Sequence, residues 1–160
     1  MKILYICTHN RCRSILSEAI TNHVGQGCII AKSAGSQPSG EVHPLSLKYL
    51  DEVGISVDGL RSQSWDDFAD FSPDIVITLC DSAAAESCPL WFGKAVKVHW
   101  GLSDPSKLQG SDETIATAFK QTIAQISQRV EQLLALNMES DDQDQLRKAM
   151  VKLPGVVVTH

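Results

Sequence analysis

A short segment near the N-terminus holds the residue types that nucleophilic chemistry on an anion requires. It consists of Cys7, Thr8, His9, Asn10, Arg11, Cys12, Arg13 and Ser14. The apolar run before it predicts a strand and the pattern after it predicts a helix, so a tight loop would join the two. The backbone N–H groups of such a loop and the positive end of the helix favour a bound oxyanion. The same field would lower the pKa of the Cys7 thiol and make Cys7 the nucleophile.

Arg13 and Ser14 complete this motif. Arg13 offers a planar fork of donors that matches a tetrahedral oxyanion. Ser14 is expected to cap the following helix and to donate a hydrogen bond to the sulfur of Cys7. We therefore expect the whole segment to bind the substrate, with Cys7 and Arg13 as catalytic residues. A chance C-x5-R-S sequence in an unrelated loop is the alternative.

The remaining side chains of the loop have less defined roles. His9 and Arg11 are expected at its outer turns, where they would meet the substrate or a partner. Cys12 is either a small packing residue, which is the interpretation we favour, or a second thiol that protects Cys7 from over-oxidation.

Asp104 is the candidate general acid. It follows a predicted strand and a turn that contains Gly101, and it precedes Pro105. An aspartate before proline is also common in turns that have no catalytic role. Combined with the Cys7 loop, the general acid is the reading that we favour.

Cys80 and Cys88 form a second pair of sulfur side chains, eight residues apart. A zinc site would need a tighter cysteine pair with further cysteine or histidine ligands. Two buried thiols with a packing role are a further alternative. The interpretation we favour is a resolving pair, in which Cys80 attacks the sulfur chemistry at Cys7 and Cys88 then takes over the bond with Cys80.

Apolar runs and helical patterns alternate along the rest of the chain. Strands are expected at residues 3–6, 28–31, 74–79 and 95–100, and helices at residues 14–24, 44–54, 65–71 and 114–136. This alternation predicts a single doubly wound α/β domain with a central, parallel, four-stranded sheet flanked by helices. Ligands bind beyond the C-terminal ends of the strands in such folds. Cys7, Ser33, Cys80 and the residues after Trp100 all lie at such ends.

The end of the chain differs from the rest. Residues 1–137 are expected to form the domain and residues 138–160 a C-terminal tail. The tail is acidic at first and ends in an apolar run, so it either adds a helix and an edge strand or stays unattached. Within the domain, Cys28 is expected in the core and His43, before Pro44, at the start of a helix.

Composition excludes several classes of function. The chain has 160 residues, 43% of them hydrophobic, and a net charge of −5, which disfavours bulk binding to nucleic acid or to an anionic membrane. The N-terminal apolar run is too short for a signal peptide, and no stretch reaches the length of a membrane span. We therefore expect a cytoplasmic monomer. Its five cysteines would be mostly reduced there, which favours redox chemistry or catalysis over structural disulfides.

Several separated motifs resemble one family of proteins. The Cys7–Ser14 segment, Ser33-Ala34-Gly35 and Asp104-Pro105 resemble the low-molecular-weight protein tyrosine phosphatases. The arsenate reductase branch of that family is the more similar one, on the motifs Ser33-Ala34-Gly35-Ser36-Gln37-Pro38, Ile77-Thr78-Leu79-Cys80-Asp81, Cys88-Pro89 and His99-Trp100-Gly101-Leu102-Ser103-Asp104-Pro105. The resemblance covers about residues 2 to 137 and leaves the tail outside.

This resemblance implies a reduction of arsenate by three thiols. Cys7 would attack arsenate held by the loop and Arg13, and Asp104 would protonate the departing hydroxyl. Cys80 would then attack Cys7 and release arsenite, and Cys88 would attack Cys80. Thioredoxin, or a glutaredoxin with a low-molecular-weight thiol, would reduce the Cys80–Cys88 disulfide.

The resemblance also implies a possible metal ion but no tightly bound cofactor. Some members of this branch bind potassium beside the loop through oxygen ligands, which suit a hard cation. The corresponding positions here are Asn10, Glu18, Ser33, Ser64 and Asp66.

Two other functions remain open. A phosphotyrosine phosphatase would need Cys7, Arg13 and Asp104 but neither Cys80 nor Cys88. Phosphatases of this fold carry aromatic residues just after the Asp-Pro pair, whereas Ser106 and Lys107 follow here. Weak phosphatase activity is therefore expected only as a side reaction. A non-enzymatic redox or regulatory module would predict an unreactive Cys7, which fits poorly with Arg13 and the loop.

Overall fold

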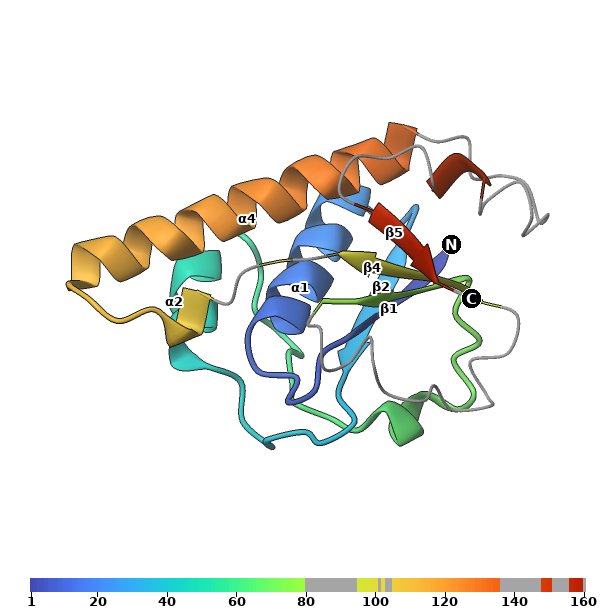
Figure 1. Cartoon of the computed structure of the whole chain (residues 1–160), viewed down its shortest axis with the longest axis horizontal. Helices are drawn as coiled ribbons and strands as arrows, with labels where there is room; N and C mark the ends of the chain where they lie inside the picture. The colour runs from blue at the N-terminus through green and yellow to red at the C-terminus, as the bar shows by residue number, and fades with distance from the viewer. Residues whose placement is uncertain (80–94, 101, 103–104, 136–147, 151–155, 160) are drawn as a thin grey trace.

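Short apolar runs form the strands of one sheet (Figure 1). The strands are β1 (Lys2–Ile6), β2 (Ile30–Ala34), β3 (Ile75–Thr78), β4 (Val96–Trp100) and β5 (Val156–Thr159). Their order is β2-β1-β3-β4-β5, in which the first four are parallel and β5 is antiparallel to β4. The predicted α/β domain with a central sheet of four parallel strands is confirmed. The central strands β1 and β3 are mostly apolar because both faces of the sheet are covered.

The structure is a computed structural model of the whole chain. It describes residues 1–79, 95–100, 102, 105–135 and 148–150, and the backbone of residues 156–159. The predicted roles of Cys80, Cys88 and Asp104 fall on residues outside these ranges.

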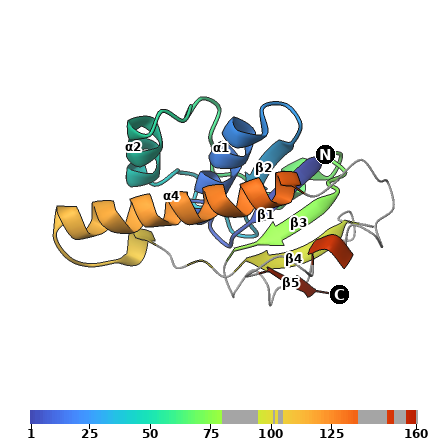
Figure 2. The same ribbon diagram turned by 90° about the horizontal axis from the view of Figure 1, so that it is seen from above.

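Three helices cover one face of the sheet (Figures 1 and 2). They are α1 (Arg13–Gly25), α2 (Pro44–Glu52) and α4 (Asp112–Ala135). The larger hydrophobic core lies between these helices and the inward side chains of the strands, such as Tyr5 of β1 and Trp100 of β4. Both rings are completely buried, with centroids 5.7 Å apart.

A smaller core lies on the opposite face of the sheet. Alternate residues of the strands, such as Leu4, Ile6 and Val76, turn to this side because successive side chains of a strand point to opposite faces. Trp65 and Phe68, from the 3₁₀ helix η1 (Trp65–Phe68), pack against them. The side chain of Cys7 belongs to this second core.

The prediction that β2 begins at Cys28, and that Cys28 is buried, is wrong. Cys28 is exposed, and its N–H donates to the carbonyl of Gly25 (2.9 Å), so it still belongs to the turn that ends α1. Gln26 and Gly27 of this turn both have positive φ, 44° and 90°. Because of this turn, β2 begins only at Ile30. The side chain of Ile30 is half exposed because β2 lies at the edge of the sheet.

The C-terminal tail contributes to the domain. β5 extends the sheet beyond β4, and residues 148–150 form a helical turn. Met150 in that turn is completely buried in the larger core. The structure therefore shows the alternative in which the tail adds a helix and an edge strand, while a domain boundary at residue 137 stays a prediction.

Candidate active site

The loop between β1 and α1 is held from outside through its backbone carbonyls. Residues 37–43, which follow β2, donate three backbone hydrogen bonds to it. These bonds run from Gln37 N to Thr8 O (2.9 Å), from Ser39 N to His9 O (3.0 Å) and from His43 N to Arg11 O (3.0 Å). In a trans peptide the C=O and the next N–H point in opposite directions. The N–H groups that follow these carbonyls therefore turn toward the inside of the loop.

Two of these N–H groups donate to no residue that the structure describes. Within the part of the chain that the structure describes, the backbone N–H groups of His9 and Asn10 donate no hydrogen bond. A concave set of such donors at the end of a strand is a site for an anion. The geometry of the loop thus agrees with the predicted oxyanion cradle.

Asn10 fixes the sharpest bend of the loop. Its φ is 49°, in the left-handed region, where asparagine is tolerated better than most residues. The side chain is completely buried and engaged at both ends. Its Oδ1 accepts from the N–H of Gln63 (2.9 Å), and its Nδ2 donates to Oγ of Ser14 (2.8 Å). Two hydrogen bonds within the protein therefore hold this bend.

Gly35 lets the chain after β2 approach the loop directly. A Cβ atom at this position would lie 2.5 Å from the carbonyl oxygen of Thr8 and 2.8 Å from that of Cys7. Both atoms belong to the backbone, so no side chain could rotate to make room. The Gly35 backbone also binds the neighbouring loop, because its N–H donates to the carbonyl of Gln63 (2.9 Å).

The expected capping role of Ser14 is wrong. Cys12 occupies the N-cap position, and Ser14 lies inside the first turn of α1, completely buried. No side chain caps the helix, and its first turn holds no acidic residue. The positive end of α1 is thus open toward the loop, which favours an anion there. A hydrogen bond from Ser14 to the sulfur of Cys7 stays a prediction.

The guanidinium group of Arg13 lies where β3 and β4 end. Its Nη1 donates to the carbonyl of Leu79 (3.2 Å), which follows β3, and to the carbonyl of Leu102 (2.9 Å), which follows β4. Three segments far apart in the sequence therefore meet at one side chain. Nε and Nη2 carry the other three N–H donors of the group.

The thiol and its surroundings differ in exposure. Cys7 is 9% exposed and Cys12 is 5% exposed, whereas His9 and Arg11 are exposed at the rim of the loop. The ring Nδ1 of His9 is 3.1 Å from the carbonyl oxygen of Gln37. The structure thus places the exposed side chains of Arg11 and His9 at the rim around a buried sulfur.

A buried polar network supports the loop from behind. Ser33 Oγ donates to Oε1 of Glu18 (2.8 Å), and both residues are buried. Burial raises the pKa of the Glu18 carboxyl, while the hydrogen bond from Ser33 and the charge of Lys32 oppose this shift. Gln63 connects this pair to the loop, because its Nε2 donates to the carbonyl of Ser33 (3.4 Å) and its N–H to Asn10.

Sequence reasoning missed Gln63 entirely. A glutamine in a polar stretch carries no chemical signature, and its importance comes from contacts with residues about 30 and 53 positions away. Gly35 could have been found, since a glycine directly after a predicted strand often marks a close backbone approach.

The potential potassium ligands are only partly brought together. Asn10, Glu18 and Ser33 are connected through Gln63, and Ser64 is beside Gly35 in an isolated β-bridge. Asp66 is exposed on η1, and its N–H donates to Oγ of Ser64 (3.2 Å). Among the residues described, no three His, Cys, Asp or Glu side chains form a metal-binding group. The oxygen atoms of Glu18 and Ser33 do suit a hard monovalent ion.

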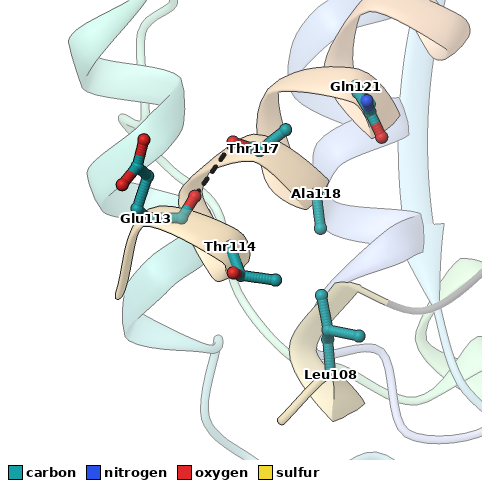
Figure 3. A pocket seen from close by; sticks show the side chains of 6 residues that line it. All are labelled: Leu108, Glu113, Thr114, Thr117, Ala118 and Gln121. Carbon is teal, nitrogen blue, oxygen red and sulfur yellow. Dashed lines mark hydrogen bonds between the residues drawn. The ribbon is translucent and has the colours of Figure 1, made fainter. Parts of the chain in front are cut away.

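Two pockets lie away from the loop. One of about 220 Å³ includes Glu18, His23 and Asp58 in its lining. The other, of about 370 Å³, is open and lies between Leu108 and the first turns of α4 (Figure 3). Neither lining holds a thiol, and we assign no chemistry to them. No helix in the described ranges is long and apolar enough to cross a membrane.

Comparison with known proteins identifies the class. The sequence profile of low molecular weight phosphotyrosine protein phosphatases matches residues 2–149, and the chain belongs to this family. The match extends beyond residue 137, into the tail. The matched range includes the loop between β1 and α1, which carries Cys7 and Arg13.

Within this family, the similar proteins are mostly arsenate reductases. The chain is 31% identical to the glutaredoxin arsenate reductase of Synechocystis sp., over 84% of this chain and 96% of that protein. It is 32% identical to the arsenate reductase of Bacillus subtilis, over 82% and 94%. A solved arsenate reductase in the reduced state has a TM-score of 0.66 at 31% identity, covering 84% of this chain and 96% of the other.

Two further solved structures widen the comparison. The thioredoxin-dependent arsenate reductase of Corynebacterium glutamicum has a TM-score of 0.63 at 28% identity, over 83% of this chain and 59% of the other. A low molecular weight protein tyrosine phosphatase from T. tengcongensis has a TM-score of 0.64 at 21% identity, over 84% and 97%, and shows likeness of fold alone.

Proposed function

We propose that this protein reduces arsenate to arsenite, with Cys7 as the nucleophile. The observation that carries the proposal is the conformation of the loop, whose carbonyls are bound outside while its N–H groups turn inward around Cys7. The relatives named arsenate reductases, at 31% to 34% identity, support arsenate as the oxyanion. The cradle itself would accept phosphate equally well, because both anions are tetrahedral.

The first step joins sulfur to arsenic. The Cys7 thiolate forms a bond to arsenic(V), held by the N–H groups of the loop and by Arg13. One arsenate hydroxyl group leaves as water after it accepts a proton from Asp104. Arg13 and the positive end of α1 stabilise the negative charge of the bound oxyanion throughout. The oxidation state of arsenic does not change in this step.

The second step transfers two electrons. The Cys80 thiolate bonds to the sulfur of Cys7, the sulfur–arsenic bond breaks, and its electron pair stays on arsenic, which leaves as arsenite. Cys88 then attacks Cys80, so Cys7 departs as a thiolate and a Cys80–Cys88 disulfide remains. Asp104, Cys80 and Cys88 lie outside the described residues, so their roles rest on the sequence.

A dithiol reductant must return the last disulfide to two thiols. Thioredoxin, or glutaredoxin with a low-molecular-weight thiol, are the candidates, since relatives of both kinds are named. A supply of reducing thiols is available in the cytoplasm, where we place the enzyme as a monomer.

Potassium is a proposed ligand of the network behind the loop. Glu18 and Ser33 would supply its protein oxygens, with Asn10 and Ser64 at its edge and exposed Asp66 as the least well-placed member. The ion would offset the cost of burying the Glu18 carboxylate.

Phosphotyrosine hydrolysis is the second candidate. It would use Cys7, Arg13 and Asp104 in the same cradle, but it would leave Cys80 and Cys88 without a role. A weak phosphatase side activity fits the shared geometry of the two reactions.

The two functions are separated by assays on one purified sample. We expect thiol-coupled arsenate reduction to exceed aryl phosphate hydrolysis, and Cys7→Ser to abolish both. Cys28→Ser is the matched control, because Cys28 is exposed at the far end of α1. Efficient hydrolysis of aryl phosphates without arsenate reduction would overturn the proposal in favour of the phosphatase.

The relay has its own test. Cys80→Ser should permit at most one adduct per enzyme, and Cys88→Ser should block recycling by thioredoxin. Release of arsenite is measured against enzyme concentration under single-turnover and steady-state conditions. Steady turnover by the Cys80→Ser protein would refute the relay.

A further inference from the structure

The hydroxyl group of Ser62 contacts the outside of the loop between β1 and α1. Its Oγ donates to the carbonyl of His9 (3.1 Å) and accepts from the N–H of Gly40 (3.1 Å). Oγ of Ser39 is a further neighbour at 3.4 Å, but the hydroxyl of Ser39 donates to the carbonyl of Glu41 (2.9 Å). A serine hydroxyl has one proton, so that of Ser62 serves the His9 carbonyl.

This bond makes the carbonyl of His9 a double acceptor, because the N–H of Ser39 donates to the same oxygen (3.0 Å). The same peptide group carries the N–H of Asn10, which turns inward and donates to no residue within the described ranges. Hydrogen bonds polarise one another along a chain, so each bond to the carbonyl strengthens the N–H of that peptide as a donor. Ser62 therefore acts from outside on a donor that faces the inside of the loop.

The segment that carries Ser62 is itself fixed to the site. The N–H of Gln63 donates to Oδ1 of Asn10 (2.9 Å), and the carbonyl of Gln63 accepts from the N–H of Gly35 (2.9 Å). Two adjacent residues thus hold the two parts of Asn10. Ser62 holds the peptide group before it, and Gln63 holds its side chain. This arrangement determines where the Asn10 N–H points at the left-handed bend, where φ is 49°.

We infer that Ser62 is a positioning residue of the oxyanion site. Its hydroxyl fixes the direction of the peptide group between His9 and Asn10 and strengthens the Asn10 N–H as a donor to a bound tetrahedral anion. Without this hydroxyl, the His9 carbonyl keeps only the bond from the N–H of Ser39, and the anion is bound less tightly. The inference deepens the proposed function and rests on the loop being the oxyanion site.

Phosphate titration of the reduced, full-length protein tests this role. Protection of Cys7 against alkylation, followed on its peptide by mass spectrometry, gives the phosphate affinity. Ser62→Ala should weaken binding about fivefold, as the loss of one hydrogen bond would, and Ser62→Thr, which keeps a hydroxyl, should restore it. Ser56→Ala is the control, because exposed Ser56 accepts only from the N–H of Asp58 (3.3 Å). Equal affinity in Ser62→Ala and wild type would overturn the inference.

Amide proton resonances separate positioning from a general loss of structure. At saturating phosphate, the Asn10 amide proton of the Ser62→Ala protein should lie upfield of its wild-type position, because it is a weaker donor. The His9 amide proton should not move, because its peptide group carries the Thr8 carbonyl, which accepts from the N–H of Gln37. Equal displacement of both resonances would indicate a distorted loop and overturn the inference. A wild-type protein without phosphate affinity would instead overturn the oxyanion site itself, which is a distinct result.

Discussion

Gly35 and Asn10 determine the shape of the loop although neither takes part in the proposed chemistry. The glycine lets two backbone segments touch, and the asparagine holds a left-handed bend through two buried hydrogen bonds. The position of Cys7 and Arg13 on one loop could be predicted from the strand and helix patterns around them, and their reactivity stays a prediction. The supporting contacts with Gln63 could not, since they depend on how distant segments meet in the fold.

Gly35→Ala should weaken oxyanion binding roughly tenfold or more. The added methyl group meets the carbonyl oxygens of Thr8 and Cys7, and relief of such overpacking costs about 1 to 3 kcal/mol. Phosphate protection of Cys7 against alkylation measures the effect. Gly25→Ala is the matched control, because its methyl group would meet only the side chain of Ile29, at 3.3 Å. Equal phosphate affinity in both variants would contradict the close approach.

Glu18→Gln should make the protein more stable relative to wild type as pH rises. Burial raises the folded-state pKa of Glu18 above that of the unfolded chain. Between these two pKa values the folded state holds more protons than the unfolded state, so wild-type stability falls as pH rises through the window. Glutamine keeps an acceptor for Ser33 without the charge.

Urea unfolding from pH 4 to pH 8 measures this difference, with exposed Glu113→Gln as the control. A pH-independent difference between Glu18→Gln and wild type would contradict the assignment. If potassium binds beside Glu18, replacing sodium with potassium should reduce the difference at high pH.

The elements of the fold were predicted more accurately than their ends. Helix α4 follows from clear helical periodicity and strand β3 from an unbroken apolar run, and the structure places both within a few residues of the expected bounds. The start of β2 was misplaced because the turn at Gln26 and Gly27 extends to Cys28, whose apolar side chain continues the pattern of Ile29 and Ile30 although it is exposed. Edge strands are also harder to recognise, because one of their sides is open to solvent.

Asn22 on α1 closes part of that edge. Its Nδ2 donates to the carbonyl of Ala31 (3.0 Å), and its Oδ1 accepts from the N–H of Ala31 (2.8 Å). The side chain therefore takes the place that a neighbouring strand would occupy, which limits pairing between molecules.

Asn22→Ala should lower the free energy of unfolding by about 1 to 3 kcal/mol, since it removes two hydrogen bonds at once. It should also increase self-association at high concentration, because the edge of β2 becomes available. Urea unfolding and sedimentation measure the two effects. Gln128→Ala, on the exposed face of α4, should change neither. A variant with the same stability and the same self-association as wild type would show that the edge needs no such cover.

At the scale of the whole molecule, the tail completes the sheet that carries the site. β5 lies against β4, and β4 leads to Leu102, whose carbonyl binds Arg13. The sequence left open whether the tail would attach, because an isolated apolar run such as Val156-Val157-Val158 does not say which edge it will pair with. The order of the strands settles this, since β4 would otherwise be the second open edge.

Deleting residues 138–160 should destabilise the domain by at least about 3 kcal/mol. The deletion removes the buried side chain of Met150 from the larger core and the ladder between β4 and β5. Urea unfolding with Met150→Ala as a partial control measures the contribution of each part. A truncated protein with the wild-type midpoint would instead support residues 1–137 as an independent domain.

The outer hydrogen bonds of the loop have a consequence for the order of assembly. They join residues 8–11 to residues 37–43 and 62–63, so the cradle cannot close until these distant segments have docked. Contacts of such sequence separation form late in folding. An anion added during refolding would therefore have no binding site on the unfolded protein. It would bind only the folded protein, so it should lower the unfolding rate and leave the folding rate unchanged.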